Sequence, residues 1–419
     1  MMQLPFTQTI TTAFAEAVGM HGADSKRFAA LRASLAPAMQ ELTTMPGPEA
    51  SAILRLPTAT DDLPEIMAIA ARLRARFRTL VVVGMGGSSL GGETLAQLAT
   101  PDAPALRFID NIDPDRLAQQ MASYDWPNTA FLVVSKSGGT VETTALMAIL
   151  LAEVEAQGLA PAEHFVVITI ANDNPFHRLA QARGMVVSAH DPDLCGRFSI
   201  LGNVGLIPAA FAGVDIQALR AGAAAVLAEG ASAAVDAAAL HLTLFEQGVG
   251  VHVLMHYRER LTGLANWYRQ CWAESLGKEG KGTIPVRCRG AVDQHSQLQL
   301  YLEGPRDKWF TALVQDVRGQ GRSLAMPGST DPRLDYLRDH TLGDLLTAEQ
   351  RGTNDTLVSA GRPLRSITFE QLNARTFGAL IMHFTLEVML TARLMEVNAF
   401  DQPAVEAGKK RALEYLARG

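Results

Sequence analysis

Short apolar runs alternate with helical stretches through the first half of the chain, and this alternation limits the possible folds more than any other feature. The stretches between the runs are rich in alanine and leucine, as is typical of helices. Strands separated by helices predict βαβ units and a doubly wound parallel sheet, whose ligands bind at the carboxyl ends of the strands. The runs lie at Thr79–Val83, Ala105–Ile109, Ala130–Val134, Phe165–Ile170 and Met185–Val187.

A second, weaker round of the same pattern follows and predicts a second sheet of this α/β class. Gln297–Leu302 fits a strand or a helix equally well. Further strands are expected at Val249–Met255, Gly290–Val292, Trp309–Val317 and Arg365–Phe369. Helices are expected at Phe6–Met39, Ile216–Ala239, Phe377–Glu396 and Pro403–Ala417.

The alanine-rich stretch between the two rounds predicts a domain boundary near residue 225. The expected parts are an N-terminal helical segment at 1–54, a first domain at 55–225, a second domain at 226–395 and a C-terminal helix at 396–419. With 48% hydrophobic and 19% charged residues, the chain has enough apolar material for sizeable cores.

The overall charge excludes a broad nucleic-acid surface, because the net charge is −6 and such surfaces need an excess of clustered Lys and Arg. The three cysteines are widely spaced and predict neither a disulfide framework nor a metal knuckle. We expect a cytosolic chain with no signal peptide and no membrane span. His252 and His256 are four residues apart, but their apolar surroundings favour core histidines over metal ligands.

A glycine-rich loop, Gly84–Gly92, directly follows the first apolar run. Its glycines, Gly87 among them, would let the backbone approach an anion closely, and Ser88 adds a hydroxyl. The pattern fits a phosphate or dinucleotide site, but it also fits an ordinary turn that packs a helix against a sheet.

A second loop after Ala130–Val134 is more specific, because its hydroxyl groups surround two glycines before the next helix. Hydroxyls together with backbone amides suit a phosphomonoester, each oxygen of which accepts several hydrogen bonds. The candidate phosphate ligands in this loop are Ser135, Lys136, Ser137 and Thr140.

Two alternatives remain open for these loops. A nicotinamide-dependent dehydrogenase would need an acidic residue about 20 positions beyond the first loop, and Asp110 or Asp113 could serve. The hydroxyls could also be helix caps, with Ser137 or Thr140 at the cap and Glu142 in the first turn.

The two loops together resemble the sugar-isomerase (SIS) domain, and four later motifs resemble the glucose-6-phosphate isomerase (phosphoglucose isomerase) family. The resemblance covers about residues 55 to 415 and implies two SIS domains with flavodoxin-like αβα sandwiches. The motifs are Cys195–Ser199 followed by Gly205–Pro208, then Trp267–Lys278, Asp293–Ser296 and Asn398–Lys409.

The resemblance assigns a role to each matching residue. Glu274 would be the base that moves a proton between C1 and C2, while Arg197 stabilises the enediolate. His295 and Lys409 would open the sugar ring, and Lys410 is a less well aligned alternative to Lys409. Gln402 would contact the phosphate or its loop, with Gly87, Ser88 and the second loop also binding substrate.

The implied function is the reversible interconversion of glucose 6-phosphate and fructose 6-phosphate, in glycolysis and gluconeogenesis, without a metal or organic cofactor. His295 would enter the site from the neighbouring subunit, which implies a homodimer. A related isomerase that also accepts mannose 6-phosphate, or a non-catalytic sugar-phosphate-binding SIS protein, would share these features. The departures from the family pattern are Cys195, Gly202, Asn203 and Ala404.

Overall fold

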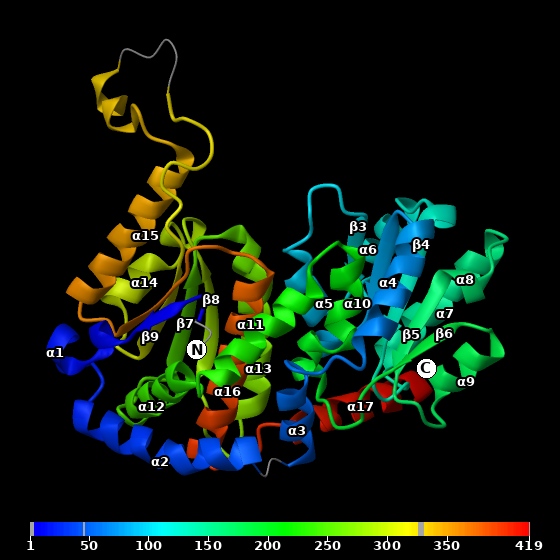
Figure 1. The fold of residues 1–419 in the computed structure, drawn as a ribbon, viewed down its shortest axis with the longest axis horizontal. Helices are drawn as coiled ribbons and strands as arrows, with labels where there is room; N and C mark the ends of the chain where they lie inside the picture. The colour runs from blue at the N-terminus through cyan, green and yellow to red at the C-terminus, as the bar shows by residue number, and fades with distance from the viewer. Residues whose placement is uncertain (1–3, 45–46, 326–330, 419) are drawn as a thin grey trace.

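Two five-stranded sheets lie side by side in the computed structural model, which describes residues 4–44, 47–325 and 331–418 (Figure 1). The first sheet is entirely parallel, and its strand order is β3-β2-β4-β5-β6. All five strands expected from the apolar runs are confirmed, with small shifts at their ends. They are β2 (Thr79–Val83), β3 (Ala105–Ile109), β4 (Thr129–Val134), β5 (Phe165–Thr169) and β6 (Val186–Ala189).

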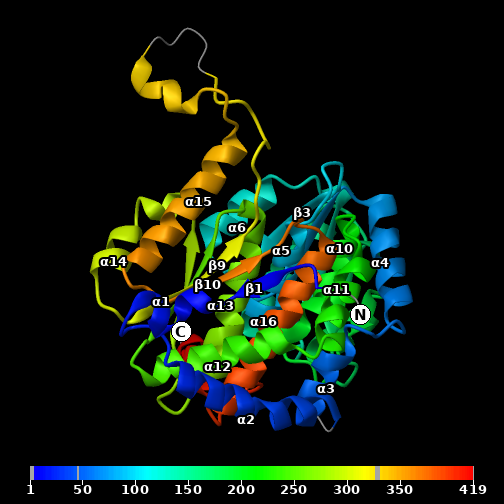
Figure 2. The same ribbon diagram turned by 60° about the vertical axis from the view of Figure 1, so that its left-hand side comes forward.

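The second sheet has the order β1-β10-β9-β7-β8, and its last four strands are parallel. These are β7 (Val251–His256), β8 (Ile284–Arg289), β9 (Lys308–Val314) and β10 (Leu364–Thr368). The first strand, β1 (Thr7–Thr9), pairs antiparallel with β10 (Figure 2). The predicted fold class, two doubly wound and mainly parallel sheets flanked by helices, is therefore confirmed.

Three expectations about single elements are wrong. Helix was predicted from Phe6, but Thr7–Thr9 is a strand because pairing with β10 overrides local preference. The strand expected at Gly290–Val292 lies earlier, at β8, whose half-exposed edge position hides the apolar signal. The expected single helix Ile216–Ala239 is broken after residue 228, where Gly230 and Ala231 have φ of 82° and 55°.

Helices cover both faces of the two sheets. Around the first sheet lie α4 (Leu63–Arg76), α5 (Leu90–Ala96), α6 (Pro114–Ala122), α7 (Val141–Ala156), α8 (Pro161–His164), α9 (Pro175–Ala182) and α10 (Asn203–Phe211). Around the second lie α11 (Ile216–Ala228), α12 (Ser232–Glu246), α13 (Thr262–Leu276), α14 (Leu298–Glu303), α15 (Leu342–Ser359) and α16 (Ala374–Leu394). The remaining helices are α1 (Ala15–Val18), α2 (Ser25–Thr44), α3 (Pro48–Arg55) and α17 (Glu406–Arg418).

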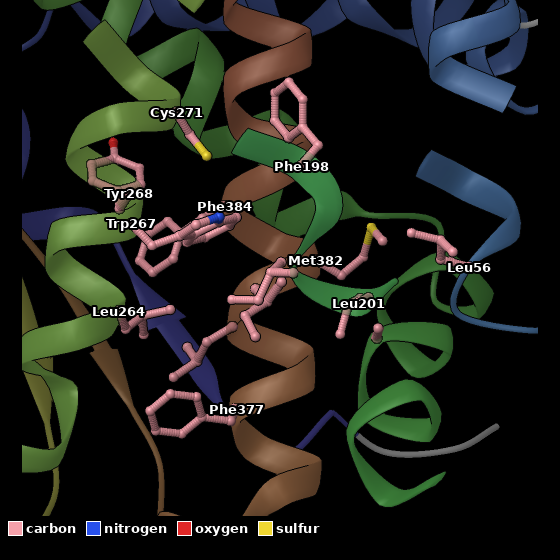
Figure 3. Packing of buried hydrophobic residues seen from close by; sticks show 14 of the residues in the cluster. Leu56, Phe198, Leu201, Leu264, Trp267, Tyr268, Cys271, Phe377, Met382 and Phe384 are labelled. Atoms are coloured by element: carbon pink, nitrogen blue, oxygen red, sulfur yellow. The ribbon is translucent and has the colours of Figure 1, made fainter. Parts of the chain in front are cut away.

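Helix α16 runs through a core that touches both halves of the molecule (Figure 3). Trp267 and Cys271 of α13 lie on one side of it, and Phe198 of the 3-10 turn η4 (Gly196–Leu201) lies on the other. The helix is long and apolar enough to span a membrane, but 89% of its apolar window is buried against the protein. It is therefore a core helix. α13 and η4 also contact each other directly, since Trp267 Nε1 donates to the Arg197 carbonyl at 2.7 Å.

His252 and His256 are both fully buried in β7, so the predicted core role is confirmed. His252 Nε2 lies 2.8 Å from Thr311 Oγ1. Among the described residues, no cluster of three or more His, Cys, Asp or Glu side chains could hold a metal ion. The domain boundaries at 54, 225 and 395 stay a prediction.

Candidate active site

The two predicted phosphate loops emerge at the same edge of the first sheet. Strands β2 and β4 are parallel neighbours, with Val83 beside Val133, so the loops after them lie next to one another. The chain continues from β2 to β3 on one side and reaches β4 on the other, which makes this the point where the strand order reverses. Ligands of doubly wound sheets bind at such a point.

The second loop forms a compact turn whose hydroxyls face each other. Ser135 is buried, and its Oγ lies 3.0 Å from Thr140 Oγ1. The Gly139 amide donates to Ser137 Oγ at 3.3 Å, and both of these residues are exposed. Lys136 is half-buried, and its carbonyl accepts from the Ile170 amide.

The capping alternative for this loop fails. Thr140 precedes α7 in the cap position, but its side chain makes no capping hydrogen bond to the helix. The amides of the first turn of this 16-residue helix therefore lack a side-chain cap beside a pair of hydroxyls. An anion bound there would complete their hydrogen bonds.

The first loop packs directly against the segment that carries Arg197. A Cβ added to Gly87 would lie 2.4 Å from the Gly196 carbonyl carbon and 2.5 Å from the Arg197 amide nitrogen. Ser199 Oγ donates to the Gly196 carbonyl at 2.7 Å and lies 3.5 Å from the Gly87 carbonyl. Gly87 is thus required for close packing of two loops, whatever it contributes to substrate. Ser88 ends the short turn η2 (Gly86–Ser88) and is half-buried.

Arg197 is the central cation of the site, because its buried guanidinium connects three separate segments. Nε donates to Ser275 Oγ at 2.9 Å, and Nη1 lies 3.2 Å from Glu274 Oε2 and 2.9 Å from Gln402 Oε1. Its side chain is only 2% exposed. The adjacent Glu274 and Ser275 lie in the last turn of α13, so the helix presents both of them, and the negative end of its dipole, to one cation.

The carboxylate of Glu274 is held at both oxygens yet remains reachable. Oε2 faces Arg197, and Oε1 accepts from Gln270 Nε2 at 2.8 Å. The side chain is 33% exposed. Gln270 was not among the predicted site residues. The signal that could have found it is its position four residues before Glu274 on the same helix.

The other predicted site residues differ in their hydrogen-bond partners. They are Gln402, His295 and Lys409. Gln402 is exposed but bound to Arg197. His295 is exposed in the loop after β8, and Lys409 is exposed on α17, where its ammonium lies 2.7 Å from Glu406. Within the described parts of the chain, no hydrogen bond or ion pair joins His295 or Lys409 to Glu274 or Arg197. The described contacts therefore join Arg197, Glu274 and Gln402 directly and leave His295 and Lys409 outside this group.

Two residues that depart from the family pattern, Cys195 and Asn203, make hydrogen bonds to neighbouring segments. Cys195 Sγ donates to the Phe400 carbonyl at 3.3 Å, and burial raises the pKa of this thiol although Arg197 opposes the shift. A thiol with a raised pKa stays neutral and can donate this hydrogen bond. Asn203 Nδ2 donates to Ser188 Oγ and to the Ala189 carbonyl, at 3.0 and 2.9 Å, and so ties α10 to β6.

Comparison with known proteins matches this sequence to one family and to named members of it. The sequence matches the family described as phosphoglucose isomerase over residues 71–289 and 345–417. These ranges contain Arg197, Glu274, Gln402 and Lys409, whereas His295 lies between them. The chain is 39% identical over 385 residues to a glucose-6-phosphate isomerase from Rubrobacter xylanophilus, covering 87% of this chain and 89% of the relative.

Two solved structures share the fold. A hypothetical protein from Thermus thermophilus superposes with a TM-score of 0.86 at 29% identity, covering 98% of this chain and 100% of that one. A glucose-6-phosphate isomerase from Chlamydia trachomatis superposes with a TM-score of 0.81, covering 99% of this chain and 88% of that one. At 22% identity, the second likeness concerns the fold alone.

Proposed function

The chain belongs to the phosphoglucose isomerase family, and we propose how its site carries out the reaction of that family. It is an aldose–ketose isomerase that interconverts glucose 6-phosphate and fructose 6-phosphate. The observation that carries the proposal is the Arg197–Glu274 pair, with nitrogen and oxygen 3.2 Å apart, beside the edge where the hydroxyl-rich loop lies. A partly exposed carboxylate next to a buried cation suits proton transfer with charge stabilisation.

The phosphate binds first and fixes the sugar. Ser88, Ser135, Lys136, Ser137 and Thr140 supply hydroxyls, amides and one ammonium at the start of α7. Holding the phosphate places C1 and C2 of the open chain against Glu274, and such positioning lowers the barrier. A dehydrogenase would leave this hydroxyl cluster without a use.

Ring opening precedes the transfer of hydrogen. His295 and Lys409 move one proton onto the ring oxygen and one away from the C1 hydroxyl, which breaks the bond between C1 and the ring oxygen. Glu274 then removes the proton from C2 and returns it to C1, while a proton passes from O2 to O1. The guanidinium of Arg197 stabilises the negative oxygen of the cis-enediolate between these two steps.

We further propose a cytoplasmic homodimer in which His295 of one chain enters the site of the other. The support is the exposed position of His295 after β8 and its lack of any described contact with Glu274. Mixing two inactive variants tests this arrangement. If Glu274→Gln and His295→Ala chains exchange subunits, about a quarter of the wild-type activity returns, because half the dimers are mixed and each has one intact site. No recovery after verified exchange would show that both residues act within one chain.

The direct test is a coupled assay with fructose 6-phosphate, repeated with mannose 6-phosphate and with a chelator. Turnover of fructose 6-phosphate supports the proposal, and turnover of mannose 6-phosphate would widen the substrate range. Glu274→Gln is expected to abolish isomerisation and to keep sugar-phosphate binding. Binding without turnover by the wild type would instead indicate a non-catalytic sugar-phosphate-binding protein.

A further inference from the structure

The segment 395–402, which we term the strap, is bound along its length by side chains of two other segments, 195–197 and 278–281. It follows the end of α16 and leads to Gln402 and then to α17. Its backbone carbonyls at positions 395, 398, 399, 400 and 401 all accept hydrogen bonds from side chains. The donors belong to Cys195, Arg197, Lys278 and Lys281.

Lys278 makes two contacts with the strap that do not involve Arg197. Its ammonium donates to the Asn398 carbonyl and lies 2.8 Å from Asp401 Oδ1, while its side chain is only 12% exposed. Water screens an ion pair less when its cation is mostly buried, and removing one partner leaves the other charge uncompensated. Lys281 adds a hydrogen bond to the Met395 carbonyl at 2.8 Å, farther from Gln402.

Arg197 holds the next part of the strap. Its Nη2 donates to the carbonyls of Ala399 and Asp401, at 2.6 and 3.1 Å. The same guanidinium also faces Glu274, so movement of the strap and movement of the catalytic cation are linked. Lys278 attaches the strap independently of Arg197. It therefore limits how far the Arg197 guanidinium can shift.

The strap also determines where α17 begins. Every described residue of α17 is exposed, so the helix is not held by burial in the core of this chain. Its start is instead set by the strap and by the turn η8 (Pro403–Val405), which joins the two. Lys409 lies in the first turn of this helix, seven residues after Gln402.

We propose that Lys278 is a positioning residue for ring opening, acting through the strap on Gln402 and Lys409. This inference rests on the proposed isomerase function. Without the ammonium, Asp401 loses its partner, and the strap is held by its bonds to Arg197, Lys281 and Cys195 and by its buried apolar residues at 395, 397 and 399. Gln402 and the start of α17 then occupy their productive positions for a smaller fraction of the time.

Ring opening can be measured separately from isomerisation. Opening followed by reclosure exchanges the two anomers of glucose 6-phosphate and breaks no C–H bond. The exchange above the spontaneous rate, followed by NMR, reports ring opening, and hydrogen exchange at C2 in deuterated water reports the step at Glu274. Displacement of catalytic groups by about 1 Å lowers rates by up to about 100-fold.

The experiment compares Lys278→Met with Lys278→Arg and with Lys26→Met, which removes an exposed lysine far along the chain. We expect Lys278→Met to lower anomer exchange by roughly 10- to 100-fold, with a KM within about threefold of the wild type. Lys278→Arg should recover most of the loss, because arginine can also bind a carboxylate and a carbonyl. Glu274→Gln should keep anomer exchange and lose exchange at C2.

Wild-type anomer exchange in Lys278→Met would overturn the inference, and so would a loss confined to KM. If Lys278→Met does not fold, Asp401→Asn tests the same contact from its exposed partner, and unchanged anomer exchange there would overturn it. Failure of the wild type to isomerise fructose 6-phosphate would instead refute the proposed function. The two failures are therefore distinguishable.

Discussion

Gly87→Ala tests how closely the first glycine-rich loop must pack against the segment that carries Arg197. An added Cβ would lie 2.4 and 2.5 Å from backbone atoms of Gly196 and Arg197, whereas ordinary contacts begin near 3.4 Å. No side chain can rotate to relieve the overlap, because the atoms met are backbone. The two loops must therefore separate by about 1 Å, which displaces Arg197 relative to the first loop.

A shift of about 1 Å in a catalytic group lowers kcat/KM on the order of 100-fold. Overpacking of this kind also destabilises the fold by about 1–3 kcal/mol, which leaves a protein of ordinary stability folded at 25 °C. The assay is steady-state turnover of fructose 6-phosphate, with urea unfolding measured on the same preparation. We expect a loss of activity far larger than any loss of folded protein.

Gly352→Ala is the matched control. Gly352 is exposed within α15, and an added Cβ would meet nothing within 4 Å. That variant should keep full activity and gain about 0.5–1 kcal/mol of helix stability. If Gly87→Ala retained kcat/KM within about threefold of the wild type, the close packing of the two loops would not control the position of Arg197.

Three further outcomes are expected. Thr140→Ala should raise the KM for fructose 6-phosphate by roughly 10-fold, because one hydrogen bond to a charged group contributes about 1.5–3 kcal/mol, and an unchanged KM would remove Thr140 from the phosphate site. Gln270→Met should lower kcat by about 10-fold with little change in KM, since Glu274 Oε1 loses its donor, and a wild-type kcat would exclude that role. Burial lowers the pKa of His256 to about 4 and that of His241 to about 3, from 6.5. Because the unfolded chain binds these protons first, each such histidine should lower the free energy of unfolding by about 1 kcal/mol between pH 6.5 and 5.5, and urea titrations showing no decrease would contradict this.

The fold was largely predictable because the strands of the first sheet are continuous apolar runs. A strand buried on both faces, such as β2 or β4, needs such a run and leaves a clear signal. The edge strands of the second sheet lack it: β8 is mostly half-buried, and β1 has three polar residues and forms by pairing with β10. The break between α11 and α12 depends on two residues with positive φ, one of them an alanine.

The sequence motifs predicted several residues of the candidate site, but they did not predict most of the contacts between them. The sequence placed Arg197, Glu274 and Gln402 in separate motifs, and the structure brings all three together. The support from Gln270 and the binding of the strap by Lys278 are tertiary contacts, which local spacing does not encode. The roles of His295 and Lys409 stay predictions, since the single chain leaves both exposed.

The pairing of β1 with β10 also governs the order in which a growing polypeptide can fold. The strands of the first sheet end at residue 189, so that sheet can form while the ribosome is still adding the second half. Residues 7–9 are translated long before residues 366–368, with which they pair. Residues 7–9 must therefore wait for β10 before they can pair, and this edge of the second sheet closes only after residues 366–368 have left the ribosome.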